Sequence, residues 1–368
     1  MNPAITPEQV FVTDGFPDLT YVGQAGGRLE TELKEGLAQA NKIVSIVGES
    51  KTGKTTLCDK IFGKERILVT GDRIENEYSL WSDAFRQLQS PVTSGYANNS
   101  VGETIDLLIK RGLPVVLDDF HYVKRELQGA ICRQMKNAAS RGLRFIVLNT
   151  PHRVDDPIRS NPDMSGRFFE VNVGFWSEND LTQIGLKGFA KLGLKVAEEV
   201  IRVLSSEALR SPQLMQTLCL ETCRVLSADV PFEHQEVTML NFDLQKIKDK
   251  AVRSYNYSTP LDSLRNGPEE RGSPRNIYLL TDGAEGDVYE VLVRILASNP
   301  PFLTISLEEL KDRALKLVRS SQQPNILMAL GNTPKLFNSR PPLQWDSTKK
   351  QLTVVDPHFY FFLRYKGK

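Results

Sequence analysis

Residues 48–55 bring two glycines, a lysine and a threonine together in the segment Gly-Glu-Ser-Lys-Thr-Gly-Lys-Thr. The two glycines let the backbone wrap closely around an anion, so that its N–H groups and the start of a following helix supply positive potential. We expect Lys54 to bridge the β- and γ-phosphates of a nucleoside triphosphate and the Thr55 hydroxyl to bind Mg²⁺. The pattern therefore predicts a P-loop for ATP and Mg²⁺, with the contact residues Gly48, Glu49, Ser50, Lys51, Thr52, Gly53, Lys54, Thr55 and Thr56.

Two adjacent carboxylates follow an apolar run about sixty residues after this segment. The run 115–117 ends in Asp118 and Asp119. A buried strand that ends in this way places its carboxylates at the carboxyl edge of a parallel sheet, where open α/β folds bind ligands. We expect Asp118 to hold Mg²⁺ through water, and Asp119 to orient or deprotonate the attacking water. A strand that merely stops at a polar turn is the alternative.

Polar residues also end the next apolar run, at 144–148. Asn149 and Thr150 follow it, so either side chain could reach the γ-phosphate or the attacking water, and Arg153 could sense the same phosphate. A simple turn at the sheet edge would explain these residues equally well. Arg167 is a candidate arginine finger acting across a subunit boundary, although a surface arginine would look the same.

These residues need a sheet to bring them together, and the apolar pattern predicts one. Runs at 43–47, 67–70, 114–117 and 144–148 are too short for helices, and 168–173 is a candidate fifth strand. Helical patterns lie between them, at 28–40, 56–62, 79–89, 101–111 and 124–140, with a loop at 90–100. Short buried runs that alternate with helices predict an α/β fold, with a parallel sheet covered on both faces.

The second half of the chain has a different pattern. No strand is expected between 177 and 275, and helical patterns at 177–225 and 241–255 predict an all-α lid. Prolines and glycines make 256–281 loop-like. Helices at 287–297, 306–319 and 324–331, followed by two short strands around 346–350, predict a winged helix. The predicted domains are an N-terminal segment (1–27), a P-loop core (28–175), a helical lid (176–255), a linker (256–281) and a winged-helix domain (282–368).

The composition is that of a water-soluble globular protein, with 368 residues, 40% hydrophobic and 25% charged. The formal charge is +1, but residues 301–368 hold 11 Lys and Arg against 5 Asp and Glu, a local charge of +6. This basic tail suggests contact with nucleic acid or an acidic protein face, and solvated charge is the alternative.

The cysteines and the hydropathy of the chain indicate the cellular compartment in which the protein works. The four cysteines, Cys58, Cys132, Cys219 and Cys223, include no Cys-x-x-Cys pair, so we expect buried free thiols in a reducing cytosol and no zinc site. The first residues lack the pattern of a signal peptide, and no apolar run reaches membrane-spanning length. The sequence therefore predicts a cytoplasmic protein without a membrane partner.

Five features in one order resemble the AAA+ superfamily (ASCE type) and, within it, the STAND signal-transduction ATPases. They are Tyr21-Val-Gly before a leucine-rich helix, the P-loop, Leu-Asp-Asp-Phe-His at 117–121, Asn-Thr-Pro-His-Arg at 149–153, and a helical lid before a winged helix. The segments 165–181, 188–189 and 211–216 are also similar to a bacterial group of such ATPases. The resemblance implies that Tyr21 and Val22 lie against the adenine, and that Pro212 packs near the nucleotide.

Two departures from the usual sequences of these families bear on the expected rate of ATP hydrolysis. STAND proteins usually carry glycine two positions before the lid proline, where this chain has Arg210. AAA+ motors usually carry a γ-phosphate-sensing arginine on the lid, where this chain has Gln213, and Asp-Glu in place of Asp118-Asp119. These departures favour a slow switch over a fast motor.

The resemblance leaves two functions open. The first is a switch that binds and slowly hydrolyses ATP, assembles into a homo-oligomer and controls a separate effector or sensor protein, as in bacterial signalling or antiviral defence. The second is a DNA-binding AAA+ ATPase of the replication-initiator or transposition-regulator type, supported by the basic winged helix. The expected third helix at 324–331 has no basic residue, which disfavours sequence-specific reading but leaves phosphate contact open. A small-molecule kinase fits poorly, because such enzymes carry a compact acceptor lid.

Overall fold

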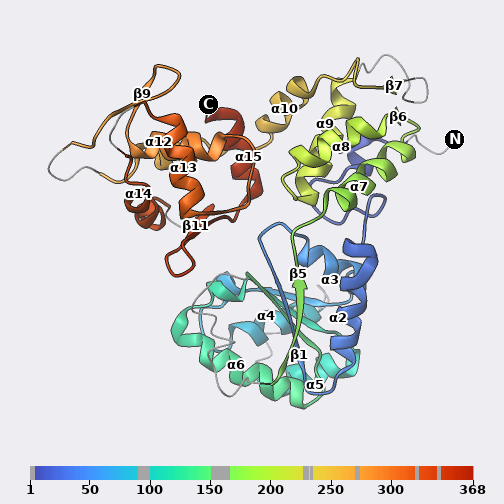
Figure 1. Cartoon of the computed structure of the whole chain (residues 1–368). Coiled ribbons are helices and arrows are strands. Elements are labelled where there is room, and N and C mark those ends of the chain that lie inside the picture. The colour runs from blue at the N-terminus through green and yellow to red at the C-terminus, as the bar shows by residue number, and fades with distance from the viewer. Residues whose placement is uncertain are drawn as a thin grey trace. The chain divides into compact units, whose positions relative to one another are not determined.

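A computed structural model describes residues 5–89, 100–150, 166–226, 232, 235–269, 274–319, 323–337 and 341–367. Internal contacts divide the chain into two compact units (Figure 1). One unit is Tyr21–Trp176, and the other combines Met1–Thr20 with Ser177–Lys368. The five predicted domains are finer than these two units and stay a prediction.

The unit Tyr21–Trp176 is built on a parallel sheet of five strands, in the order β2-β3-β4-β1-β5. Every neighbouring pair in it is parallel. The predicted α/β class and all five predicted strands are therefore confirmed. The strands are β1 (Ile43–Gly48), β2 (Ile67–Thr70), β3 (Val115–Asp118), β4 (Phe145–Asn149) and β5 (Phe168–Val173).

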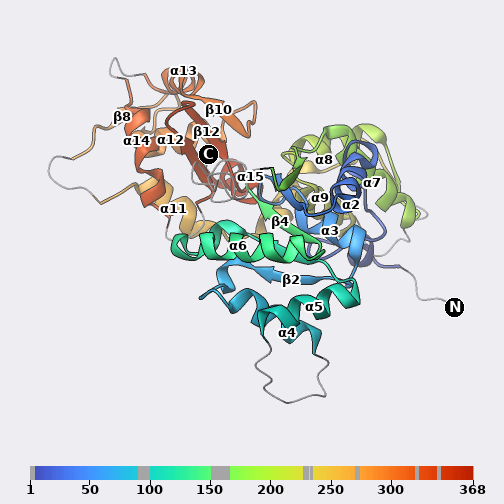
Figure 2. The same ribbon diagram turned by 90° about the horizontal axis from the view of Figure 1, so that it is seen from below.

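Helices cover both faces of this sheet, and alternate strand residues supply the two cores. Ile43, Val115 and Val147 face the core under α4, α5 and α6, while Val44, Val116 and Ile146 face the core under α2 and α3. Figure 2 shows α4, α5 and α6 gathered around β2, the edge strand furthest from β5. These helices are α2 (Arg28–Ala38), α3 (Lys54–Phe62), α4 (Ser79–Leu88), α5 (Val101–Arg111) and α6 (Arg125–Ser140).

Local sequence explains the helix ends. The Ser100 hydroxyl accepts a hydrogen bond from the Glu103 N–H, and the Glu103 carboxylate accepts one from the Ser100 N–H, so α5 begins with a capping box. Gly112 ends α5 with φ at 67°, a left-handed conformation that glycine adopts without strain. The burial of β1, β3 and β4 on both sides explains why their sequences read as continuous apolar runs.

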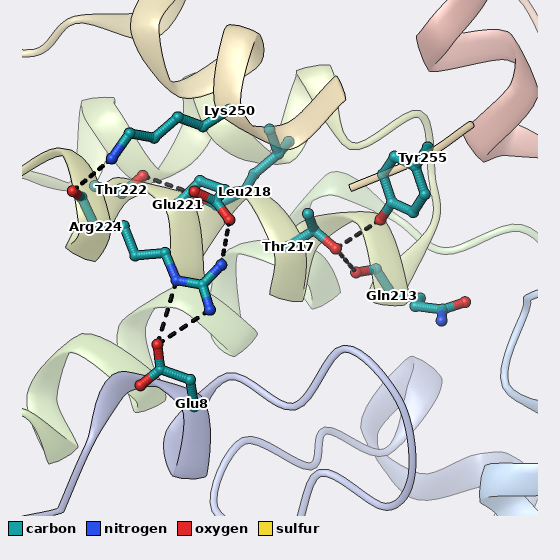
Figure 3. Close-up of polar contacts among 9 residues, drawn as sticks. All are labelled: Glu8, Gln213, Thr217, Leu218, Glu221, Thr222, Arg224, Lys250 and Tyr255. Carbon is teal, nitrogen blue, oxygen red and sulfur yellow. Dashed lines mark hydrogen bonds and ion pairs between the residues drawn. The ribbon is translucent and has the colours of Figure 1, made fainter. Parts of the chain in front are cut away.

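In the other unit the N-terminal segment packs with helices α7 and α9. Phe11 lies against Phe189 with ring centroids 5.0 Å apart, and a side chain at Gly188 would collide with the Phe11 ring. Figure 3 shows Arg224 of α9 between Glu8 and Glu221, and Thr217 beside Tyr255. The elements are α1 (Pro7–Val10), α7 (Glu178–Lys191), α8 (Glu198–Glu207), α9 (Pro212–Val225) and α10 (Leu244–Arg253).

The region after Ser177 differs from the prediction in two places. Two-residue strands β6 (Lys195–Val196) and β7 (Glu236–Val237) pair in parallel, so the expectation of no strand between 177 and 275 is wrong. Such strands are too short to leave an apolar pattern. A helix, α11 (Ser258–Asn266), lies within the stretch expected to be loop-like. Pro260 does not prevent it, because the first turn of a helix needs no N–H at that position.

The C-terminal residues contain the three expected helices, α12 (Val288–Ala297), α13 (Leu307–Leu317) and α14 (Ile326–Asn332). The strands β11 (Leu343–Asp346) and β12 (Gln351–Val354) form the expected antiparallel pair. The sequence pattern missed β10 (Thr304–Ser306), which pairs with β12, and the final helix α15 (Pro357–Lys366). It also missed the small hairpin of β8 (Tyr278–Leu279) and β9 (Glu285–Gly286). The winged helix itself stays a prediction.

Candidate nucleotide-binding site

The predicted P-loop connects the carboxyl end of β1 to the start of α3. Lys51 and Gly53 have positive φ angles, 62° and 94°, which turn the backbone back on itself. A Cβ atom at Gly48 would lie 2.6 Å from the carbonyl oxygen of Val173, so only glycine fits there. No side chain caps the N-terminus of α3, and its first N–H groups are therefore positioned to bind an anion.

The Lys54 ammonium lies inside this turn. Its Nζ donates to the carbonyl oxygens of Gly48 and Glu49, both at 2.8 Å, and the residue is 8% exposed. Burial lowers the pKa of Lys54, while the carboxylates of Asp118, Asp119 and Glu49 oppose that shift. A phosphate placed in the turn would give this buried cation a charged partner, which is what the P-loop prediction requires.

The two predicted Mg²⁺ ligands lie next to each other. The Thr55 hydroxyl donates to Oδ2 of Asp118 at 2.9 Å, although 63 residues separate them. Burial raises the pKa of Asp118, and the neighbouring charge of Asp119 raises it further. A divalent cation at this pair would favour the charged carboxylate. The donor set is the hard oxygen chemistry that Mg²⁺ prefers.

Asp119 has a left-handed backbone, with φ at 53° and ψ at 43°. Its carbonyl accepts from the N–H of Tyr122 at 2.9 Å and closes a short turn, η3 (Phe120–Tyr122). A side chain at Gly71 would collide with this carbonyl. The close approach of the two backbones holds Asp119 in a conformation that few non-glycine residues adopt, and such outliers concentrate at functional sites.

Asn149 ends β4, next to β1. It pairs in register with Val47, one residue before the P-loop begins. Its Nδ2 lies 3.4 Å from the hydroxyl oxygen of Ser45, and the residue is buried. Asn149 is therefore brought to the same carboxyl edge of the sheet as the P-loop and the Asp118-Asp119 pair.

One predicted arginine, Arg167, is not brought to this edge. Arg167 precedes β5, and its carbonyl accepts from the N–H of Ile43 at 2.9 Å, so it lies where the strands begin. The P-loop follows the opposite end of β1, so Arg167 is distant from the site of its own chain. Arg153 lies outside the described residues.

The predicted adenine contacts lie on the segment before α2. Tyr21 and Val22 are both half-buried. The Tyr21 hydroxyl donates to Oε1 of Glu30 at 2.6 Å, and burial together with this carboxylate raises the pKa of Tyr21. The ammonium of Lys60, from α3, lies 4.9 Å from the Tyr21 ring centroid. Pro212 is the first residue of α9 in the other unit, and its predicted role beside the nucleotide stays a proposal.

The sequence pattern missed two residues around the P-loop. The indole N–H of Trp176 donates to the carbonyl oxygen of Thr52 at 2.9 Å. The side-chain amide of Gln24 donates to the carbonyl oxygen of Gly174 at 2.9 Å. No motif marks either residue. The only signal in the sequence is that a buried indole must find an acceptor.

These contacts fit ATP and Mg²⁺. Backbone N–H groups of residues 50–56 and the Lys54 ammonium would hold the phosphates, and Thr55 and Asp118 would hold the metal. In the described parts of the chain, no three His, Cys, Asp or Glu side chains form a metal cluster. A protein usually holds Mg²⁺ with one or two carboxylates plus the phosphates of the substrate. When bound, the cation would neutralise charge that develops on the phosphates.

Comparisons with known proteins agree with this fold. No protein-family model and no curated protein matches the chain. Among solved structures, a Walker-type ATPase of Pyrococcus abyssi is similar, with a TM-score of 0.55, 17% identity, and coverage of 92% of this chain and 95% of that one. The Orc1 protein of Aeropyrum pernix, solved in complex with DNA, has a TM-score of 0.50 and 14% identity, covering 97% and 95%.

The chain therefore shares the α/β fold of these two structures, with a five-stranded parallel sheet at its centre. Among the described residues, every helix is too short or too polar to cross a lipid bilayer. The four cysteines are buried and unpaired by disulfides, as the sequence predicted.

Proposed function

We propose that this protein is an ATPase that works as a slow molecular switch, binding ATP with Mg²⁺ and controlling a separate partner protein. The observation that carries the proposal is the convergence of Lys54, Thr55 and Asp118 at the carboxyl edge of the parallel sheet. Lys54 would bind phosphate, and Thr55 and Asp118 would bind the metal. These contacts are the minimal set for phosphoryl transfer. Asp119 follows β3 and Asn149 ends the neighbouring strand β4, and both would position the attacking water.

Slow hydrolysis is supported by the residues that replace those of a motor. Asp119 is one methylene shorter than glutamate, so its carboxylate reaches less far towards an attacking water. Gln213 is uncharged, and its side-chain amide already donates to the carbonyl of Thr13 at 2.6 Å. An amide in that position supplies no positive charge for the γ-phosphate.

A homo-oligomer is part of the proposal because of Arg167. It lies at the edge of the sheet where the strands begin, away from the P-loop of its own chain. An arginine finger from this position can serve only the site of a neighbouring subunit. The partner under control would be a separate effector or sensor protein.

A DNA-binding ATPase is the second candidate. Lys349 and Lys350 are exposed on the turn between β11 and β12, where a wing would meet phosphates. Against sequence-specific binding, the exposed residues Leu327 and Met328 of α14 are apolar. The similar Orc1 protein was solved in complex with DNA, which gives this candidate its second support.

ATP hydrolysis measured with and without duplex DNA separates the two candidates, with size-exclusion chromatography in parallel. The switch predicts slow turnover that DNA changes less than twofold, and assembly on addition of ATP. A tenfold stimulation by DNA, lost at high salt, would replace the switch with the DNA-binding candidate. Absence of hydrolysis and of ATP binding would refute both.

A further inference from the structure

Trp176 links the P-loop to the chain segment that enters α7. Its indole N–H donates to the carbonyl oxygen of Thr52 at 2.9 Å, and the residue is 8% exposed. Trp176 is the last residue of the unit Tyr21–Trp176, and Ser177, the next residue, caps α7. Figure 1 shows β5 continuing through this segment towards α7.

The segment 173–176 makes two further contacts, one of them with the P-loop. Gly48, the first P-loop residue, lies directly against the carbonyl of Val173, with no space for a Cβ atom. The carbonyl of Gly174 accepts from the side-chain amide of Gln24 at 2.9 Å. Trp176 is therefore not a loose contact, because the backbone before it is itself anchored beside the P-loop.

The bond from Trp176 fixes the orientation of one peptide group. In a planar trans peptide the C=O and the following N–H point in opposite directions. The Thr52 carbonyl and the Gly53 N–H belong to the same peptide group. A donor that fixes the direction of the Thr52 carbonyl therefore also fixes the direction of the Gly53 N–H, on the opposite side of the peptide. A preoriented N–H binds an anion without first losing conformational freedom.

We propose that Trp176 is a positioning residue for nucleotide phosphate. It keeps the peptide between Thr52 and Gly53 in the orientation that turns the Gly53 N–H towards a bound phosphate. This inference rests on the proposed binding of ATP, since it concerns the same site. It adds a residue that the P-loop motif does not contain.

Trp176→Phe removes the indole N–H and keeps an aromatic ring. Loss of one hydrogen bond should weaken ADP binding roughly three- to tenfold, measured by isothermal titration calorimetry with Mg²⁺. Trp81→Phe is the matched control. Trp81 is 2% exposed in the same unit and donates to Gln134 at 2.8 Å, so it loses an equivalent bond at a place without a P-loop contact.

The control should change ADP affinity less than twofold, while both variants lower the unfolding temperature by a similar amount. Equal ADP affinity in the two variants would overturn the proposal. If the wild type itself binds no ADP, the proposed function fails, whereas normal binding by wild type and by Trp176→Phe refutes only the role of Trp176.

Fluorescence gives a test that does not depend on the Trp176 variant. The chain has three tryptophans, so the double variant Trp81→Phe/Trp345→Phe leaves Trp176 as the only one. Its emission should change on titration with ADP and Mg²⁺ and saturate at the ADP dissociation constant. No change at saturating ADP would mean that the indole does not respond to the P-loop, and the proposal would be wrong.

Discussion

Replacing Asp118 by asparagine should separate metal binding from stability. The amide keeps the shape of the side chain and can still accept the hydrogen bond from Thr55, but it loses the negative charge. Loss of a charged interaction costs about 1.5–3 kcal/mol, so the Mg²⁺ affinity of the ATP complex should fall roughly 10- to 150-fold. The assay is ATP binding by calorimetry at increasing Mg²⁺ concentrations, with the ATP affinity in EDTA as the internal control.

Without nucleotide the same substitution should raise the unfolding temperature. The pKa of Asp118 is raised above its usual value, so the folded protein disfavours the charged carboxylate at neutral pH. This cost disappears as the pH falls through the raised pKa. The stability difference between wild type and Asp118→Asn should therefore be largest near neutral pH and vanish in acid.

Acid removes the stability cost of the charged Asp118 carboxylate, but it also weakens Mg²⁺ binding, because the ion needs the deprotonated carboxylate. In the wild type, Mg²⁺ affinity should fall as the pH drops towards the raised pKa of Asp118, and Asp118→Asn should lose that dependence. If Asp118→Asn required no more Mg²⁺ than the wild type, Asp118 would not be a metal ligand. An unchanged or lower unfolding temperature would contradict the effect of burial on its charge.

Two further predictions concern ATP hydrolysis and the stability of the unit that contains α9. Asp119→Asn should keep ATP affinity within threefold and lower the turnover of ATP hydrolysis at least roughly 100-fold, because the proposed general base is lost. Phosphate release measures the turnover, and normal turnover would show that Asp119 is not the general base. Arg224→Ala should lower the free energy of unfolding by about 1–2 kcal/mol in urea titrations, because it leaves the buried carboxylate of Glu221 without its cation. Arg202→Ala, which breaks an exposed pair with Glu198, should cost less than about 0.5 kcal/mol, and equal losses would contradict the role of burial.

The sheet and the polar residues at its carboxyl edge were predictable because they rest on local sequence patterns. Buried strands leave short apolar runs, and residues such as Asp118 and Asn149 mark where those runs end. Parallel strands bring their carboxyl ends to one edge, so proximity of the polar residues followed from the fold class. For the same reason the pairing of Thr55 with Asp118 could be anticipated across 63 residues.

Contacts that depend on tertiary packing could not be predicted. Trp176 and Thr52 are 124 residues apart, and neither an apolar period nor a motif connects them. The association of Phe11 with Phe189 likewise depends on how the N-terminal segment packs on α7. Very short strands and a helix with proline in its first turn escaped because packing overrides weak local preference.

Direct titration of ATP with Mg²⁺ into the wild type and into Lys54→Ala tests the central claim most directly. Lys54 is the buried cation of the predicted P-loop, and its Nζ donates to the carbonyl oxygens of Gly48 and Glu49, both at 2.8 Å. On the proposed function, its ammonium would bind the phosphates of the nucleotide. We predict saturable binding to the wild type and a loss of at least roughly 100-fold in affinity for the variant, at an unchanged fold by circular dichroism. Equal affinity in the two proteins would contradict the assignment of this site.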